Sequence, residues 1–278
     1  MKRRGFAITV LRNSAAWLVG IAWLSPFVGV FLLSLQPVAS LAYGWWDPHT
    51  WNFSFSNYIR AFTDPTIHLK SATVNTFLVS ILGTIFPMVL GAPAAYALAR
   101  YRLPFKRGWL VLTLVLLVIP FQMLAIPVFK IMRNLRLINT LTSVIIMDTA
   151  TALPWIIYFM MNFFRVQPVD AEEAARLDGA GRLGVFLFIA LPQAIPALAS
   201  VFVLQFIWCW IDFFLPLIFL YTPDKYVIMQ IIPLQIGQFR TAWGVLAALC
   251  VYATSIPLLV FAVLQKYYVK GQIGWFGE

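Results

Sequence analysis

The sequence predicts an all-α membrane protein with six transmembrane helices. Hydrophobic residues make up 62% of the 278 residues and charged residues only 11%, and the mean hydropathy is +0.85. A soluble globular domain carries about 25% charged residues. Apolar runs also reach the roughly 20 residues that a helix needs to cross a bilayer. Polar segments divide these runs into six predicted spans, at about 14–36, 75–99, 108–129, 141–164, 195–220 and 242–265.

The first apolar run follows a basic start, Met1-Lys2-Arg3-Arg4, which is a pattern shared with signal peptides. The run continues to about Gln36 with no Ala-x-Ala-like site at its end, so we expect an uncleaved first span. The polar segment 37–70 comes next and is expected to be extracytoplasmic. Its aromatic side chains suit a membrane–water interface, and they include Trp45, Trp46, Trp51 and Tyr58.

The other connections are short. The second span ends at a basic turn, 100–107, and the third is expected to be broken by Pro120 and Pro127. A polar joint at 130–136 precedes the fourth span. The connection 226–239 is fairly apolar but too short to cross a bilayer, so we expect a loop or re-entrant segment there.

The distribution of Lys and Arg predicts the orientation. With the N-terminus inside, 13 of the 20 basic residues fall on the cytoplasmic side and 7 on the other. The positive-inside rule therefore favours cytoplasmic N- and C-termini, although the cluster at 130–136 counts against it. This role in orientation accounts for much of the net charge of +10 without a nucleic-acid partner.

Motifs for catalysis are absent from the sequence. There is no Gly-x4-Gly-Lys-Ser/Thr loop, so we expect no cradle for ATP phosphates. The two histidines, His49 and His68, have no partners at ligand spacing, and Cys209 and Cys250 lie in apolar runs. We therefore predict no catalytic residue, cofactor or metal site in this chain.

One polar stretch, 165–192, stands out between the fourth and fifth spans. Pro168 suits the first position of a short helix, and Gly179 suits the left-handed turn that ends it. Glu172 and Arg176 are four residues apart in the favourable order. The helix start carries acidic residues that complement the helix dipole, namely Asp170, Glu172 and Glu173. One face of the helix carries small residues, namely Ala171, Ala174, Ala175 and Asp178.

The same stretch resembles the signature loop of bacterial ABC-importer permeases. The resemblance rests on Glu173-Ala174-Ala175, Gly179 five residues after Ala174, and Ile189-x-Leu191-Pro192. It implies that the loop is cytoplasmic and forms a coupling helix, which docks on the ATP-hydrolysing subunit. The residues to which it assigns this role are Glu172, Glu173, Ala174, Ala175, Asp178 and Gly179.

Two carboxylates fall within predicted spans, Asp148 and Asp212, and a charge there is expected to face a cavity or a partner. Asp212 follows Trp208 and Trp210, and aromatic rings together with carboxylates can hold a sugar. We therefore consider these four residues, with Gln122, as candidates for the substrate path. The alternative is that the tryptophans pack and Asp212 only bonds a neighbouring helix.

The segment from Phe206 to Pro216 resembles the fifth span of carbohydrate-importer permeases of the maltose type. Two departures are Ile211, where that family usually has Asn, and the tail 271–278, where it more often ends in Gly-x-Val-Lys-Gly. The resemblance covers nearly the whole chain. It implies a single permease domain, 1–278, of the type-1 ABC importer fold, with a core at about 72–264.

The predicted function is that of a permease subunit of an ATP-driven sugar importer in a bacterial plasma membrane. The resemblance implies several partners, namely a second permease, two ATPase subunits and an extracytoplasmic substrate-binding protein, besides membrane lipid. One alternative is the same machine for a polyol, glycerol phosphate or polyamine. Others are an ion-coupled carrier and a non-transporting scaffold.

Overall fold

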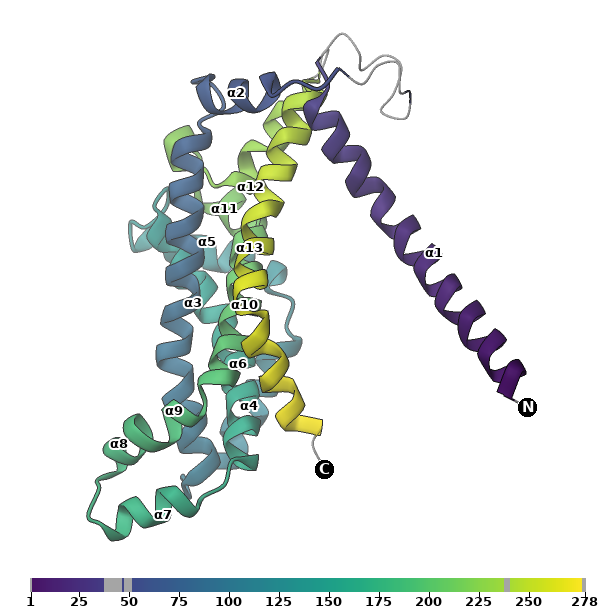
Figure 1. Ribbon diagram of the computed structural model, residues 1–278. Helices are drawn as coiled ribbons and strands as arrows, with labels where there is room; N and C mark the ends of the chain where they lie inside the picture. The colour runs from purple at the N-terminus through teal and green to yellow at the C-terminus, as the bar shows by residue number, and fades with distance from the viewer. Residues whose placement is uncertain (1, 38–46, 48–51, 238–240, 277–278) are drawn as a thin grey trace. The chain divides into compact units, whose positions relative to one another are not determined.

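The computed structural model describes residues 2–37, 47, 52–237 and 241–276. Four helices in this part of the chain are long and apolar enough to cross a membrane, with spans at Arg12–Leu35, Leu69–Arg100, Leu141–Val166 and Trp243–Gln265. Two pairs of helices pass the same criteria but are sharply bent. Residues 106–118 and 121–134 meet at 91°, and residues 182–193 and 195–211 meet at 73°. Six spans result when each bent pair is counted as one, which is the predicted number. Figure 1 shows the helices along the chain.

The chain divides into two compact units, each described here by itself. One consists of residues 1–69 and 231–255 and contains α1 (Lys2–Leu35) and α2 (Ser56–Thr63). The Asn57 side chain of α2 donates to the backbone oxygens of Ser34 and Gln36, at 2.9 and 2.8 Å. These bonds satisfy carbonyls that the end of α1 leaves without helical partners. The interfacial role expected for Trp45, Trp46 and Trp51 falls outside the described residues.

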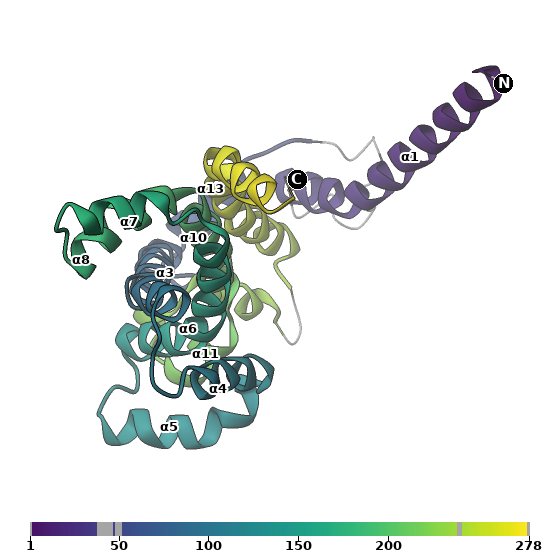
Figure 2. The same cartoon turned by 90° about the horizontal axis from the view of Figure 1, so that it is seen from below.

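The other unit consists of residues 70–230 and 256–278, and α6 (Leu141–Val166) is its central helix. Helices α4 (Lys106–Val118), α10 (Ile195–Ile211) and α11 (Phe214–Phe219) all pack against α6. Figure 2 shows these helices together with α3 (Leu69–Arg100). The helix α13 (Trp243–Phe276) runs through parts of both units.

The predicted third span is a bent pair of helices. Helix α4 ends at Val118, and Pro120 precedes a 3-10 turn that leads into α5 (Ala125–Asn134) at an angle of 91°. The expected break at Pro120 is therefore present. The break expected at Pro127 is not, because this proline lies in the first turn of α5, where a missing N–H costs little.

The predicted fifth span is also interrupted. Helix α10 ends at Ile211, and the Asp212 carboxylate accepts the backbone N–H groups of Phe214 and Leu215 at 2.9 and 3.3 Å. Asp212 thereby caps the start of α11, as an N-cap aspartate does. The segment predicted as the fifth span, 195–220, therefore comprises α10 and α11, and the 73° bend lies before α10, between residues 182–193 and 195–211. The connection 226–239 contains α12 (Ile228–Ile231) and a 3-10 turn, Pro233–Gln235.

Asn139 joins the connection before α6 to the one after α11. Its backbone is left-handed, with φ 60°. The side chain donates to Thr222 Oγ1 at 2.6 Å and accepts the backbone N–H groups of Tyr221 and Thr222 at 3.2 Å. Its own carbonyl accepts a 2.6 Å bond from Lys225 Nζ. One residue thus fixes a chain segment that lies more than 80 positions away.

Candidate functional site

A cavity of about 600 Å³ lies among α4, α6, α10 and the bends that follow α4 and α10. Two rows of three side chains line it. Asp148, Thr151 and Trp155 stand at positions i, i+3 and i+7 of α6, and the same spacing on the other side gives Gln205, Trp208 and Asp212. This spacing places side chains on one face of a helix. The two faces line the cavity with indoles, carboxyls, an amide and a hydroxyl.

A hydrogen-bond network holds one side of the cavity. Trp155 Nε1 donates to Gln205 Oε1 at 3.0 Å. Gln205 Nε2 in turn donates to the backbone oxygen of Gly83 at 3.3 Å and lies 3.1 Å from Cys209 Sγ. Three helices, α3, α6 and α10, are connected through this one amide. A side-chain amide that satisfies groups on two neighbouring helices fixes their spacing within a membrane.

Asp148 is the most deeply buried acid of the cavity, with 5% of its surface exposed. Its Oδ2 atom makes no hydrogen bond within the described part of the chain. A Cβ at Gly83 of α3 would lie 3.0 Å from Asp148 Cβ and 3.1 Å from Cys209 Sγ. Glycine at position 83 therefore gives this carboxyl the room that it occupies.

The candidates from the sequence separate into two groups. Gln122, Asp148, Trp208 and Asp212 all line the cavity, and Trp208 is 67% exposed. Trp210 does not line it. Its side chain is fully buried and packs on Phe77 and Phe206, with ring centroids 5.0 and 5.6 Å away. The expectation that Trp210 contributes to the substrate path is corrected, because Trp208 and Trp210 point to different sides of α10.

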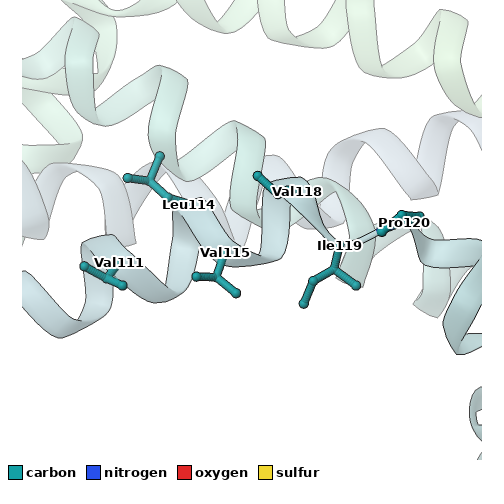
Figure 3. Close-up of a pocket in the computed structure, with 6 residues that line it drawn as sticks. All are labelled: Val111, Leu114, Val115, Val118, Ile119 and Pro120. Atoms are coloured by element: carbon teal, nitrogen blue, oxygen red, sulfur yellow. The ribbon is translucent and has the colours of Figure 1, made fainter.

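Sequence reasoning missed Trp155, Thr151 and Gln205. The sequence contains a repeated spacing that could have indicated them. Trp155 follows Asp148 by seven residues, and Asp212 follows Gln205 by the same number. A second hollow, of about 560 Å³, lies along α4 and is lined by Val111, Leu114, Val115, Val118, Ile119 and Pro120. Figure 3 shows these side chains, none of which can hydrogen-bond a polar solute.

The loop predicted to couple to the ATPase forms a short helix, α7 (Asp170–Leu177), which packs against α8 (Arg182–Val185). Gly179 has φ +88° and ends the helix as expected. The N–H of Ala180 bonds Ala175 O at 2.9 Å, and the N–H of Gly179 bonds Arg176 O at 3.1 Å. These two bonds make a complete Schellman motif. The expectation for Pro168 was wrong, because α7 begins two residues later.

Glu172 faces the protein interior and is only 2% exposed. Its carboxylate accepts hydrogen bonds from Arg100 Nε at 2.9 Å and from Tyr96 Oη at 2.7 Å, both on α3. The expected pair with Arg176 is present at 3.4 Å. Arg100 also donates to the backbone oxygen of Gln167 at 2.9 Å. The assignment of Glu172 to an ATPase-facing surface is therefore corrected, since the residue anchors α7 to α3.

Two arginines surround Tyr101 at the end of α3. The guanidinium carbons of Arg176 and Arg182 lie 5.9 and 5.3 Å from the ring centroid, within cation–π range. The neighbouring Tyr96 hydroxyl raises the pKa of Arg176, with smaller contributions from Tyr101 and Glu172. Arg176 therefore stays charged and bridges α7 to the tyrosines of α3.

The remaining predicted residues of α7 point outward. Glu173, Ala174, Asp178 and Gly179 are exposed, and Ala175 is half-buried. Leu177, which the sequence reasoning did not single out, is 89% exposed. Figure 1 shows α7 and α8 next to each other at the same end of their unit. This exposed face combines small side chains, one large apolar side chain and carboxylates.

Known proteins are similar to this chain in sequence and in fold. A probable ABC transporter permease protein from Pyrococcus horikoshii is 43% identical over 266 residues, with 96% of each chain covered. A trehalose transport system permease protein from Mycobacterium tuberculosis is 34% identical, with 91% of each chain covered. A solved bacterial ABC transporter involved in the import of the acidic polysaccharide alginate has a TM-score of 0.79 and 25% identity, covering 93% of this chain and 96% of that one.

A family model completes the comparison. The model of the binding-protein-dependent transport system inner membrane component matches residues 88–273, which include the cavity and the loop of α7. The predicted fold and the predicted identity as a multi-pass permease subunit of an ABC importer are confirmed. The chain belongs to the family of binding-protein-dependent transport system inner membrane components.

Proposed function

We propose that this permease subunit carries a sugar through the cavity between α6 and α10. The cavity itself is the observation on which the proposal depends, because it joins the exposed ring of Trp208 and the indole of Trp155 to carboxyl, amide and hydroxyl groups. Aromatic faces suit the C–H groups of a sugar, and the polar groups suit its hydroxyls. The matched relatives include proteins named for trehalose, alpha-glucoside and arabinooligosaccharide transport.

The composition of the cavity bears on the alternative solutes. Its lining within the described chain contains no Lys, Arg or His, although a phosphate group calls for such a cation. Glycerol phosphate is therefore a poor match. A polyol presents the same hydroxyls as a sugar, and a polyamine would pair with Asp148 and Asp212. An ion-coupled carrier would need no ATPase. A transport assay with and without the ATPase subunit distinguishes the two functions.

We further propose that the outward face of α7 is the contact for an ATPase subunit. The exposed Ala174 permits close backbone approach, while Glu173 and Asp178 offer charged contacts. ATP hydrolysis then takes place in that separate subunit, and this chain has no enzymatic role. Closure of two ATPase copies would move α7, and the link from Glu172 to α3 would carry the movement to the membrane helices.

The assembly would also contain a second permease and an extracytoplasmic substrate-binding protein. A structural relative is an alginate ABC transporter bound to a periplasmic protein that holds an alginate pentasaccharide. We place this chain in a bacterial plasma membrane with cytoplasmic termini, as the charge distribution favours. Segment 37–70 then lies on the outer side, as do Asn139 and the residues 221–225 that it bonds.

ATP-dependent uptake by the assembled importer tests the proposed function. Membrane vesicles would be supplied with the binding protein and a panel of radiolabelled mono- and disaccharides, with glycerol and putrescine for comparison. Trp208→Ala should lower sugar uptake by about ten-fold, because the ring lines the cavity. Trp109→Ala is the matched control, since Trp109 is 55% exposed on α4 and does not line the cavity. Equal uptake by both variants, or transport without ATPase, would contradict the proposal.

A further inference from the structure

A cluster of positive charge lies on α5 and the turn that follows it. Lys130, Arg133 and Arg136 are all exposed, and they make up the cluster that counts against the orientation favoured by the other basic residues. None of the three makes an ion pair or a side-chain hydrogen bond within the described part of the chain. Exposed charges of one sign attract molecules of the opposite sign. The cluster is therefore open to an anionic partner from outside the chain.

Helix α5 runs across the membrane-spanning direction and not along it. Residues 121–134 meet α4 at 91°, and α4 belongs to a span. Figure 2 shows α5 from the side, whereas α3 of the same unit is seen nearly along its axis. A helix that lies at a right angle to the spanning helices is parallel to the plane of the bilayer.

The position of α5 along the spanning helices is that of a membrane surface. Its buried Met132 belongs to the same core cluster as Val79 of α3. Val79 stands 21 positions before Arg100, which corresponds to about 32 Å along an α-helix. The hydrocarbon core of a bilayer is about 30 Å thick. With the basic turn 100–107 at one membrane surface, α5 therefore lies at the opposite surface.

The side chains of α5 suit the boundary between acyl chains and headgroups. Ile131 and Leu135 are four positions apart, share a face and are 54% and 59% exposed. Lys130 and Arg133 are three positions apart and share another exposed face, while Met132 faces the protein. A helix that exposes both apolar and basic side chains is typical of a segment that lies in the interface. Long basic side chains can extend from this depth to the headgroups.

The backbone at Arg136 indicates a role for its side chain. Its φ of 58° is left-handed. The N–H of Leu137 bonds Met132 O at 2.9 Å, and the N–H of Arg136 bonds Arg133 O at 3.0 Å, which together make a Schellman motif. Glycine is the usual residue at this position, because a Cβ is unfavourable in a left-handed backbone. Strain at such a position points to a function for the residue that bears it.

We propose that α5 and Arg136 form a binding surface for the headgroups of acidic phospholipids, at the membrane surface opposite the turn 100–107. Lys130, Arg133 and Arg136 donate hydrogen bonds to the lipid phosphates. Ile131 and Leu135 contact the first part of the acyl chains. The exposed apolar side chains favour a lipid over a soluble acidic protein, because they lie at the level of the bilayer surface.

The test compares two photoreactive lipids, phosphatidylglycerol and phosphatidylcholine, which carry the same diazirine-labelled acyl chain. The assembled importer would be placed in nanodiscs that contain either lipid, and mass spectrometry would quantify the label on peptides from residues 121–138. We expect phosphatidylglycerol to label this segment at least about five-fold more than phosphatidylcholine at low salt, because each basic residue near the surface adds attraction. Salt of about 1 M should reduce the ratio to about two-fold or less.

Charge removal on α5 should lower this ratio. Lys130→Gln combined with Arg133→Gln should reduce it to about two-fold or less. Arg102→Gln combined with Arg107→Gln is the matched control, since both arginines are exposed, carry the same charge and lie at the other surface. This control should leave the ratio at α5 unchanged. Arg136→Gly serves if the α5 double variant does not assemble, because glycine relieves the left-handed backbone while removing a cation. It should lower the ratio by about two-fold without lowering thermal stability.

Three results would overturn the proposal. One is equal labelling by the two lipids in the unaltered importer, and another is an unchanged ratio in both α5 variants. The third is the absence of label from either lipid, which would show that a protein covers α5. Equal labelling that disappears when the substrate-binding protein is added would assign the surface to that protein instead. Since the readout is lipid contact at α5, each of these results leaves the proposed sugar path unaffected.

Discussion

Arg100 at the end of α3 and Glu172 on α7 form a buried ion pair, with Nε and Oε1 2.9 Å apart. The two side chains are 9% and 2% exposed. They are 72 positions apart in the sequence, so the contact links α7 directly to α3. A helix as short as α7 is marginal by itself. Its position therefore depends on this pair and on the neighbouring Tyr96 hydroxyl.

Removing Glu172 should detach α7 from α3. Glu172→Ala leaves the buried Arg100 without its carboxylate, and breaking a buried pair from one side costs about 3–5 kcal/mol. We expect faster hydrogen exchange across 167–178 and loss of coupling between ATP hydrolysis and uptake. Glu173→Ala is the matched control, because Glu173 is exposed and should leave the exchange unchanged. Unchanged exchange in Glu172→Ala would show that the pair does not position α7.

The turn after α7 depends on Gly179. A side chain at φ +88° meets a left-handed penalty of roughly 1–2 kcal/mol. Gly179→Asp should therefore insert into the membrane, yet lose the ATPase on co-purification and abolish transport. Gly181→Ala is a suitable control, since Gly181 also has open space around it but has φ −69°. Normal transport and a retained ATPase in Gly179→Asp would contradict the coupling role.

Charge at the outward face of α7 gives an independent check. Glu173→Lys keeps the helix and its buried anchor but reverses an exposed charge. We expect weaker association with the ATPase and an increased dependence of that association on salt, because exposed charge pairs are screened. Thermal unfolding of the permease should stay within about 0.5 kcal/mol of the unaltered protein. Association that is unaffected at low salt would exclude Glu173 from the contact.

Substitutions of Asn139 should separate backbone strain from side-chain bonding. Asn139→Gly keeps the left-handed backbone but loses the side-chain bonds to Tyr221 and Thr222, each worth about 0.5–1.5 kcal/mol. Asn139→Ala loses the same bonds and adds the left-handed penalty of about 1–2 kcal/mol. Alanine should therefore lower the unfolding temperature more than glycine. The opposite order would show that φ 60° is not maintained in the membrane.

Single cysteines test the proposed orientation. In a background without Cys209 and Cys250, Arg107→Cys and Arg182→Cys should be shielded from an impermeant thiol reagent added outside, and Asp47→Cys should react. This pattern follows from the excess of basic residues on the side of the N-terminus. Reaction of Arg182→Cys from outside would reverse the arrangement and place α7 away from any cytoplasmic ATPase.

The sequence by itself determined the class of the protein, the number of spans and the place of the short polar helix that precedes Gly179. Bilayer thickness sets the length of an apolar helix, so composition along the chain is sufficient to count spans. Local backbone chemistry likewise decides the turn at Gly179, because only its immediate neighbours take part. The helical ends near Gln36 and Arg100 follow from the same one-dimensional information.

Only the tertiary structure decided which side chains face each other. Trp208 and Trp210 differ by two positions, which turns them to different sides of α10, and burial alone distinguishes the ring in the core from the ring in the cavity. Glu172 and Glu173 are adjacent, yet one is anchored to α3 and the other is exposed. Sequence patterns report the periodicity of a helix, whereas partners such as Arg100 come from helices that meet only when the chain has folded.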